Sequence, residues 1–390
     1  MVVDEELTLL MIPGPVAIHP RVYRAMSRVL YGHRTPEFQS VYKDITTMLK
    51  QLLQTDKDVL VFAGSGTAAM EAAIANLIEP GDKVLNVING KFSERWYDLT
   101  KAFRGAPIKQ EYDYGRAADP EAIARALEAD KDIRVVTICH NETSTGVLNP
   151  AEQIGRVVRE HDRLLVVDGI TSVGGDYVFP DKWDFDMLVT GSQKCLGTPP
   201  GLGMIWVGAR AWQKIKARKN PNPTFYLDLP MAKKEFDEVG NCPFTPAVTL
   251  MYGLRESLKM IFEEGYELRV QRHRRLGRIT RAGYLGMGLD LLADPAYYSN
   301  TVTAVKYPAT LKDKDFTDWV RRLGILVAGG QGPLKGKIFR TNHMNVCTDR
   351  DILMTMAVVE VALKKLGAKI KLGSGVAAAE EQLLKDLKEP

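Results

Sequence analysis

Three stretches of the sequence follow candidate strands with residues that could bind or transform a small molecule. The first is Gly64-Ser65-Gly66-Thr67, where small residues would let backbone N–H groups and two hydroxyls contact an anion at the start of a helix. The same residues also suit a plain strand–turn–helix junction with Thr67 near the N-cap. This motif alone therefore leaves phosphate binding and a structural turn open.

The other two stretches place an acid and a lysine after strands. The apolar run 164–167 ends in Asp168, at the edge where α/β sheets bind ligands. A candidate strand at 187–190 leads through a small-residue turn to Lys194. A lysine partly removed from water can form a Schiff base, and an acid can keep a pyridine ring protonated. Taken singly, a capping acid and a surface lysine are simpler explanations, but the three features in this order are typical of fold-type I enzymes that use pyridoxal phosphate (PLP).

A sheet covered by helices is needed to bring these residues together. Short apolar runs predict strands at residues 59–62, 84–88, 135–139, 164–167, 187–190 and 204–207. Apolar residues at helical spacing lie between them, at 41–52, 68–78 and 152–160. Strands that are apolar throughout and alternate with helices indicate a largely parallel sheet covered on both faces, hence an α/β fold.

The last third of the chain predicts a different, smaller unit. Long helical stretches are expected at 254–277 and 351–366, with a shorter helix at 314–323 and strands at 302–307, 326–327 and 337–340. We therefore expect three parts: an N-terminal segment over residues 1–20, a large PLP-binding domain over 21–263, and a small C-terminal α+β domain over 264–390.

The chain resembles the class V aminotransferases, and within them the alanine–glyoxylate and serine–pyruvate aminotransferases. The resemblance covers nearly the whole length. It is carried by Pro13-Gly-Pro15, Gly32-His-Arg34, Gly64-Ser-Gly-Thr-Ala68, Glu79-Pro-Gly-Asp-Lys-Val84, Glu142-Thr-Ser-Thr-Gly146, Asn149-Pro150, Thr190–Lys194, Pro199-Pro-Gly201, Phe225-Tyr-Leu-Asp228 and Tyr252-Gly-Leu-Arg-Glu-Ser257. It implies the fold-type I architecture and PLP as the cofactor.

The resemblance also implies roles for individual residues around the cofactor. Lys194 would hold PLP as a Schiff base and shuttle a proton, and Asp168 would pair with the pyridinium nitrogen. Phe92 would stack on one face of the ring and Ile170 on the other, while Thr143 would contact the ring oxygen or Asp168. The phosphate ligands would be Ser65, Gly66, Thr67 and Gln193.

Two further segments are matched to a partner subunit and to the substrate. The resemblance of Phe244-Thr245-Pro246 implies a homodimer in which Thr245 reaches the partner's phosphate. Arg340 would bind the substrate carboxylate, a task that suits the two-pronged guanidinium. Around it, Thr341, Asn342 and Asn345 replace an apolar residue and two glycines of the family's usual pattern, which affects the expected shape of the substrate pocket.

The expected activity is a ping-pong transamination. A small amino acid such as serine or alanine would give its amino group to the cofactor, and glyoxylate or pyruvate would accept it. An unusual donor, namely ureidoglycine, pyridoxamine or aspartate, is the alternative. A cysteine-desulfurase-like lyase is a further rival, but Phe92 and Gln193 occupy positions where those enzymes have histidines, and neither Cys195 nor Cys347 has the context of a mobile catalytic cysteine.

Composition argues against several other classes of function. The net charge is +4, from 52 basic and 48 acidic residues that are scattered along the chain, so a nucleic-acid partner is not expected. No apolar run is long enough for a membrane helix, and the first residues lack a basic leader region. Four widely spaced cysteines predict a reducing, cytoplasmic location, and no metal site is expected. His273 is expected on a solvated helix face.

Overall fold

The computed structural model describes residues 8–308, 311 and 313–387. Residues 1–7, which belong to the predicted N-terminal segment and on which the expectation of no leader rests, lie outside this range. Residues 388–390 of the predicted C-terminal domain also lie outside it. None of the described helices is both long enough and apolar enough to cross a membrane.

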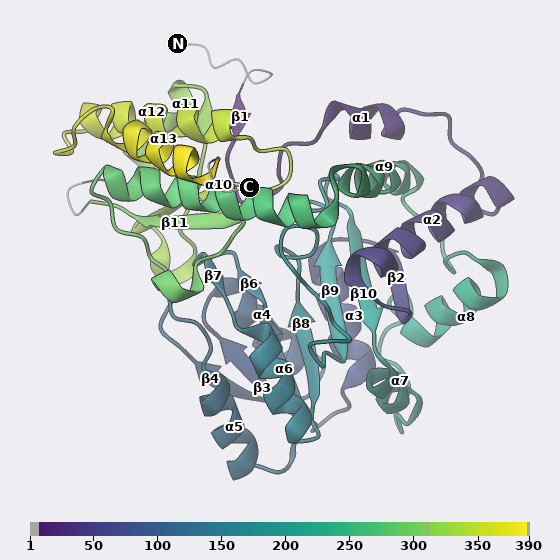
Figure 1. The fold of residues 1–390 in the computed structure, drawn as a ribbon. Coiled ribbons are helices and arrows are strands. Elements are labelled where there is room, and N and C mark those ends of the chain that lie inside the picture. Colours follow the sequence, from purple (N-terminus) through teal and green to yellow (C-terminus); the bar gives the residue numbers. More distant parts are fainter. Residues whose placement is uncertain (1–7, 309–310, 312, 388–390) are drawn as a thin grey trace.

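A seven-stranded sheet forms the centre of the described chain (Figure 1). Its strand order is β2-β10-β9-β8-β5-β3-β4, and β10 runs antiparallel to both of its neighbours while the others are parallel. The strands are β2 (Asp58–Ala63), β3 (Lys83–Ile88), β4 (Ala106–Glu111), β5 (Ile133–Cys139), β8 (Leu164–Asp168), β9 (Met187–Gly191) and β10 (Leu202–Val207). The predicted parallel α/β sheet is confirmed, with β4 as an additional edge strand.

Helices cover both faces of this sheet, and alternate strand residues pack on opposite sides. In β2, Val59 and Val61 join one apolar cluster, whereas Leu60 and Phe62 join another. The first cluster includes residues from α2 (Pro36–Leu53), α5 (Pro120–Ala129), α6 (Ala151–Glu160) and α9 (Val248–Glu264). The second includes residues from α3 (Gly66–Leu77), α4 (Lys91–Ala102), α7 (Ala209–Lys216) and α8 (Leu229–Val239).

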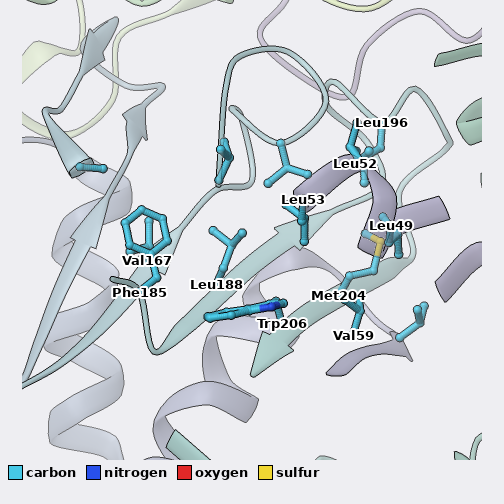
Figure 2. Close-up of a cluster of buried hydrophobic side chains, with 14 of the residues drawn as sticks. Leu49, Leu52, Leu53, Val59, Val167, Phe185, Leu188, Leu196, Met204 and Trp206 are labelled. Atoms are coloured by element: carbon cyan, nitrogen blue, oxygen red, sulfur yellow. The ribbon is translucent and has the colours of Figure 1, made fainter. Parts of the chain in front are cut away.

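Figure 2 shows part of the first cluster, where leucines of α2 lie near Met204 and Trp206 of β10. Burial on both sides explains why the strands appear in the sequence as continuous apolar runs rather than as alternating patterns.

The C-terminal third has an apolar cluster of its own. Buried residues of α10 (Tyr266–Gly286) and α12 (Asp349–Lys365) pack there, together with Met11 from near the N-terminus. The other elements of this part are β11 (Val302–Lys306), α11 (Asp313–Arg322), β12 (Ile325–Leu326), β13 (Ala328–Gly329), β14 (Ile338–Asn342) and α13 (Ser374–Asp386). The separate cluster supports a domain boundary near residue 264, which stays a prediction.

The prediction of one long helix at 254–277 is wrong in one respect, because the structure has two helices there. α9 ends at Glu264 and α10 begins at Tyr266. Gly265 between them has φ 86° and ψ 125°, a backbone conformation that favours glycine and ends the helical path. Apolar residues of α9 pack against the central sheet, whereas those of α10 pack mainly in the C-terminal cluster.

The N-terminal segment connects the two parts of the molecule. Strand β1 (Leu9–Leu10) pairs in parallel with β12, so β1 lies beside the C-terminal elements (Figure 1). After β1 the chain passes the loop that carries Lys194 and enters α1 (Pro20–Met26), which packs near α9. A short hairpin, β6 (Asn141–Glu142) with β7 (Val147–Leu148), follows β5.

Candidate active site

The predicted residues gather at the carboxyl edge of the parallel strands. Asp168 is the last residue of β8, and Lys194 lies in the turn that follows β9. Ser65 is the N-cap of α3, directly after β2. Phe92 belongs to the first turn of α4, and Arg340 comes from β14 in the C-terminal part. Five elements that are distant in the sequence therefore contribute to one edge of the sheet.

Lys194 is buried, with only 8% of its surface exposed. Its Nζ donates a hydrogen bond to the Pro13 carbonyl and lies 5.9 Å from the centroid of the Phe92 ring. Burial and the nearby positive charge of Arg340 lower the pKa of the Lys194 amine to about 8. A lowered pKa leaves more of the amine neutral at pH 7 than in an exposed lysine. Such an amine can act as a nucleophile and as a base.

Asp168 is also buried and is held by two donors. Its Oδ1 accepts the Ile170 N–H at 2.7 Å, and its Oδ2 accepts the Cys139 thiol at 3.4 Å. Burial raises the pKa of the Asp168 carboxyl to about 6. A cationic ring nitrogen placed against this carboxylate would favour its charged form.

The start of α3 brings together small residues and polar groups in a turn, here called the cradle: Ser65, Gly66, Thr67 and Gln193. A Cβ on Gly66 would lie 2.5 Å from Ile170 Cδ1, so only glycine leaves the backbone free here. A Cβ on Gly191 would lie 2.9 Å from Gln193 Oε1, which is buried and has no hydrogen-bond partner. At the start of α3 the Thr67 N–H donates to the Ser65 hydroxyl at 3.2 Å and the Ala68 N–H to the Ser65 carbonyl at 2.9 Å, and helix N-termini favour anions. These residues fit the phosphate end of PLP.

Phe92 is fixed by a carboxylate at the start of α4. Glu142 is fully buried and accepts the backbone N–H of Phe92 at 3.3 Å and of Ser93 at 2.8 Å. Gly90 must be small, because a Cβ there would lie 2.3 Å from the Glu142 carboxyl carbon. An acid at a helix N-terminus is electrostatically favourable, and here it also sets the position of the Phe92 ring.

Arg340 is 5% exposed and bonds only to carbonyl groups in the described chain. Its guanidinium donates to the Thr143 carbonyl at 3.2 Å and to the Gly329 carbonyl at 3.1 and 2.9 Å. Burial lowers the pKa of Arg340. Thr143 also contributes its hydroxyl, which is 2.6 Å from that of Thr171 rather than bonded to Asp168. The positive charge of Arg340 acts on Lys194, and the Glu142 carboxylate in turn favours the charged guanidinium.

Two of the unusual residues after Arg340 form hydrogen bonds with neighbouring parts of the fold. The Thr341 hydroxyl accepts from Tyr284, and Asn342 donates its side-chain N–H to the Leu10 carbonyl at 3.2 Å. Thr341 and Asn342 therefore hold the surrounding structure.

Asn345 joins the N-terminal segment to the Lys194 loop. Asn345 has φ 60°, a conformation that asparagine tolerates better than most residues, which explains why it can replace a glycine. Its side chain donates to the Ala17 carbonyl and accepts from Arg269, which itself donates to the Cys195 carbonyl. Its backbone N–H is accepted by His273. The expectation that His273 is solvated is wrong: it is fully buried between α10 and this segment.

Thr245 is not brought to the other predicted residues within one chain. It is exposed in the loop before α9 and lines a small hollow with Ala63 and Tyr226. Sequence reasoning also missed Arg95, whose Nη1 donates to the Thr67 hydroxyl at 2.8 Å. Its position three residues after Phe92, on the same helix face, is the signal that could have identified it.

Known proteins match this chain over almost its full length. The aminotransferase class-V family model matches residues 21–336. An uncharacterised aminotransferase of Methanocaldococcus jannaschii is 46% identical over 99% of this chain and 100% of its own length. The serine–glyoxylate aminotransferase of Methylorubrum extorquens is 36% identical over 96% of this chain and 95% of its own.

The architecture agrees with these matches. The crystal structure of pyridoxamine–pyruvate aminotransferase from Mesorhizobium loti has a TM-score of 0.93 and 31% identity, covering 99% of this chain and 100% of that one. The chain belongs to the aminotransferase class-V family and is a PLP-dependent aminotransferase of fold type I.

Proposed function

We propose that this enzyme transfers the amino group of a small amino acid, such as serine or alanine, to glyoxylate or pyruvate in a ping-pong cycle. One observation carries the proposal: the buried amine of Lys194 lies beside the Phe92 ring and within the field of Arg340. An α-amino acid bound by its carboxylate at Arg340 would have its α-carbon near that amine. Both half-reactions then use the same groups, because donor and acceptor are both α-carboxylates.

Lys194 is the group that moves the proton in this proposal. Bound PLP supplies an electron sink that makes the α-proton of the substrate acidic. Lys194 would take the proton from the substrate α-carbon as a general base and would later donate it as a general acid. The depressed pKa of Lys194, about 8, suits both tasks near neutral pH. Asp168 would keep the ring nitrogen protonated, and Phe92 and Ile170 would pack against the ring.

The phosphate end of the cofactor is assigned to the start of α3. Gly66 offers free backbone, Ser65 and Thr67 offer hydroxyls, and the Gln193 amide lies against the same turn. Anions are stabilised at helix N-termini by N–H groups and by the helix dipole. Holding the phosphate there would keep the cofactor in place throughout the reaction.

A small substrate is favoured by the enclosure of Lys194. Pro13 and Gly14 lie against its side chain on one side and Phe92 on another, and both Lys194 and Arg340 are more than nine-tenths buried. Relatives of similar identity are named for serine, pyridoxamine, ureidoglycine or aspartate as the donor, and for glyoxylate or pyruvate as the acceptor. Ureidoglycine, pyridoxamine and aspartate therefore remain the alternative donors.

The test is a panel of donors crossed with the two acceptors. Purified holoenzyme is incubated with serine, alanine, aspartate, pyridoxamine or ureidoglycine and with glyoxylate or pyruvate, and both products are quantified. Serine or alanine should give the highest kcat/KM. A strong preference for one of the other donors would replace the proposed substrate, and no transamination with any pair would refute the small-donor proposal.

A lyase that uses a cysteine nucleophile is disfavoured by the thiols of the described chain. Cys195 is buried, with its sulfur 3.6 Å from the Met344 sulfur, and burial raises its pKa to about 12. Burial also raises the pKa of Cys347. Since the thiolate is the nucleophile, neither residue suits sulfur transfer. Sulfide release from cysteine at a rate near that of transamination would contradict this assignment.

We infer that the enzyme acts as a homodimer. The loop between α1 and α2 exposes Val29 by 85% and Leu30 by 60%, and Phe225 is 71% exposed beside the loop of Thr245. Exposed apolar side chains gathered in such loops favour association, and two-fold dimers are the commonest assemblies. Thr245 would then reach the phosphate in the partner's site, as the resemblance implies.

Subunit mixing tests the exchange of Thr245 directly. A Lys194→Ala subunit and a Thr245→Val subunit are each expected to be impaired alone. Mixed dimers place both defects in one site and leave the other site intact, so activity should recover on mixing. Failure to recover, or an active monomer in sedimentation at assay concentration, would contradict the exchange.

We also infer a cytoplasmic location. Cys139, Cys195, Cys242 and Cys347 are all free, which suits a reducing compartment. Fractionation of the source cells with an antibody to this chain would test it, and recovery mainly in a secreted or membrane fraction would contradict it.

A further inference from the structure

Arg95 is a charged residue beside the proposed phosphate site, and the proposed transamination gives it no role. It lies on α4, and its Nη1 donates a hydrogen bond to the Thr67 hydroxyl at 2.8 Å. Its guanidinium carbon is 5.3 Å from the centroid of the Phe92 ring, a distance suited to a cation–π contact. Arg95 therefore reaches from the helix that carries the ring-stacking residue to the helix that begins at the cradle.

The charge of Arg95 has no partner of opposite sign in the described chain. No carboxylate lies within ion-pair distance of it there, whereas its neighbour Glu94 pairs with Lys91. The first turn of α3 carries no acidic residue either. In the described part of the chain, a guanidinium, a helix N-terminus and two hydroxyls thus lie together, and no side-chain carboxylate pairs with the guanidinium.

Arg95 also acts on the reacting groups from a distance. Burial is the main cause of the shifted pKa of both Lys194 and Asp168, and the positive charge of Arg95 makes a smaller contribution that lowers both values. A solvated arginine on an outer helix face would not have this influence, because water would screen it. The side chain is only partly exposed, and its hydrogen bond points into the site rather than into solvent.

We propose that Arg95 is a positioning residue for the phosphate of the cofactor: it fixes the Thr67 hydroxyl toward the phosphate and keeps the phosphate fully ionised. Because Arg95 occupies the acceptor side of the Thr67 hydroxyl, the hydroxyl proton is left free to be donated to a phosphate oxygen. The guanidinium charge then balances the second negative charge of the phosphate. This role rests on the proposed placement of the phosphate at the start of α3.

The first experiment compares PLP with pyridoxal, which lacks the phosphate. Affinities of both compounds for the apoenzyme are measured by absorbance or fluorescence titration for the parent and for Arg95→Gln, Arg95→Lys and Thr67→Val. Arg134→Gln, which changes an exposed arginine on β5, is the matched control. Arg95→Gln should weaken PLP roughly ten- to a hundredfold, as expected for a lost charge-assisted interaction, and change pyridoxal less than about twofold.

The variants separate this role from a general packing role. If Arg95 only supports Phe92, PLP and pyridoxal should weaken by the same factor, which would overturn the proposal. Arg95→Lys keeps the charge but loses the fixed geometry, so it should recover part of the PLP affinity. If Arg95→Gln folds poorly, Arg95→Lys provides the test instead. A folded Arg95→Lys that recovers no preference for PLP over pyridoxal would count against the proposal.

The second experiment reads the ionisation of the bound phosphate by phosphorus-31 NMR. The second pKa of a phosphate monoester is about 6, so a free phosphate changes its chemical shift between roughly pH 5 and 7. In the parent holoenzyme the shift should stay constant over this range. In Arg95→Gln, at saturating PLP, it should move with pH. An unchanged, flat profile in the variant would show that Arg95 does not control the charge.

The same data distinguish a failure of this inference from a failure of the phosphate assignment. If Thr67→Val leaves PLP affinity unchanged and the parent does not prefer PLP over pyridoxal, the phosphate does not lie at α3, and the assignment itself is wrong. If Thr67→Val weakens PLP but Arg95→Gln does not, the assignment stands and only the role of Arg95 is refuted.

Discussion

Gly14 lies so close to Lys194 that a Cβ on Gly14 would be 2.6 Å from both Cδ and Nζ of the lysine. The N-terminal segment therefore forms one wall of the position that the free amine occupies. This wall is held from the other side by Asn342 and Asn345, which bond to the carbonyls of Leu10 and Ala17. Residues from both ends of the chain thus determine where the Lys194 amine lies.

We expect Gly14→Ala to displace Lys194 and to lower kcat/KM by about a hundredfold, since small misplacements of reacting groups have effects of that order. Gly81→Ala is the matched control, because Gly81 also has a positive φ but has no atom within 4 Å of its Cβ position. Both variants carry backbone strain of about 1 kcal/mol, visible in thermal unfolding, but only Gly14→Ala should slow both half-reactions. Equal kinetics in the two variants would mean that the contact with Lys194 is unimportant.

Lys194→Ala is expected to abolish the covalent attachment of PLP and to lower transamination roughly a thousandfold or more, since both the nucleophile and the proton carrier are lost. Borohydride reduction of the parent holoenzyme, followed by peptide mapping, should place the cofactor on Lys194. Lys101→Ala, which changes an exposed lysine at the end of α4, is the control and should label normally. Cofactor found on any other lysine would refute the assignment.

Asp168→Asn should slow the holoenzyme severely and yet stabilise the apoenzyme above pH 6. Burial raises the folded-state pKa of Asp168 from 3.8 to about 6, so the folded state retains a proton that the unfolded state has lost in this window. Stability therefore falls as pH rises from about 4 to 6 and stays lower above it, by about 2–3 kcal/mol.

Asparagine does not ionise, so Asp168→Asn should not lose stability as the pH rises from about 4 to 6. Denaturant unfolding of both apoenzymes at several pH values checks it: the variant's advantage should grow from pH 4 to 6 and then level off. A constant difference between the two proteins would show that Asp168 is not the titrating group, and near-normal turnover would refute its role at the ring nitrogen.

The central strands and the turns that follow them were predictable because both depend on local sequence. A strand buried on two faces is apolar throughout, as in β8, and small residues after it mark the turn that carries chemistry. Edge strand β4 was missed because Lys109 and Glu111 interrupt its apolar character at the solvated edge. The break at Gly265 was missed because apolar spacing continues across it.

The contacts that complete the site could not be predicted from local patterns. Arg95 contacts Thr67 because the central sheet brings α3 and α4 to one edge, and Pro13 contacts Lys194 because β1 pairs with β12 and directs the N-terminal segment past the lysine. His273 shows the same limit, since the face of α10 that carries it is covered by the segment of Asn345 instead of water. The residue types indicate the chemistry of the site, but the contacts that position its reactive residues depend on tertiary packing.

The last prediction concerns Arg340. Donor and acceptor are both α-carboxylates, so one clamp should serve both half-reactions, and Arg340→Lys should weaken both. Lysine keeps the charge but cannot reproduce the two-pronged bond, nor the paired bonds to the Gly329 carbonyl that orient the guanidinium. The loss should be on the order of 1.5–3 kcal/mol, or roughly ten- to a hundredfold in kcat/KM.

PLP affinity and the resting spectrum should change little in Arg340→Lys, because the phosphate is assigned to α3. Arg321→Lys, at the exposed end of α11, is the control and should behave as the parent. Stopped-flow rates measured separately with donor and acceptor decide the matter. If both stay within about twofold of the parent, Arg340 is a structural residue that joins β14 to Thr143. If only the preference among donors changes, Arg340 contacts the substrate side chain, and another residue anchors the carboxylate.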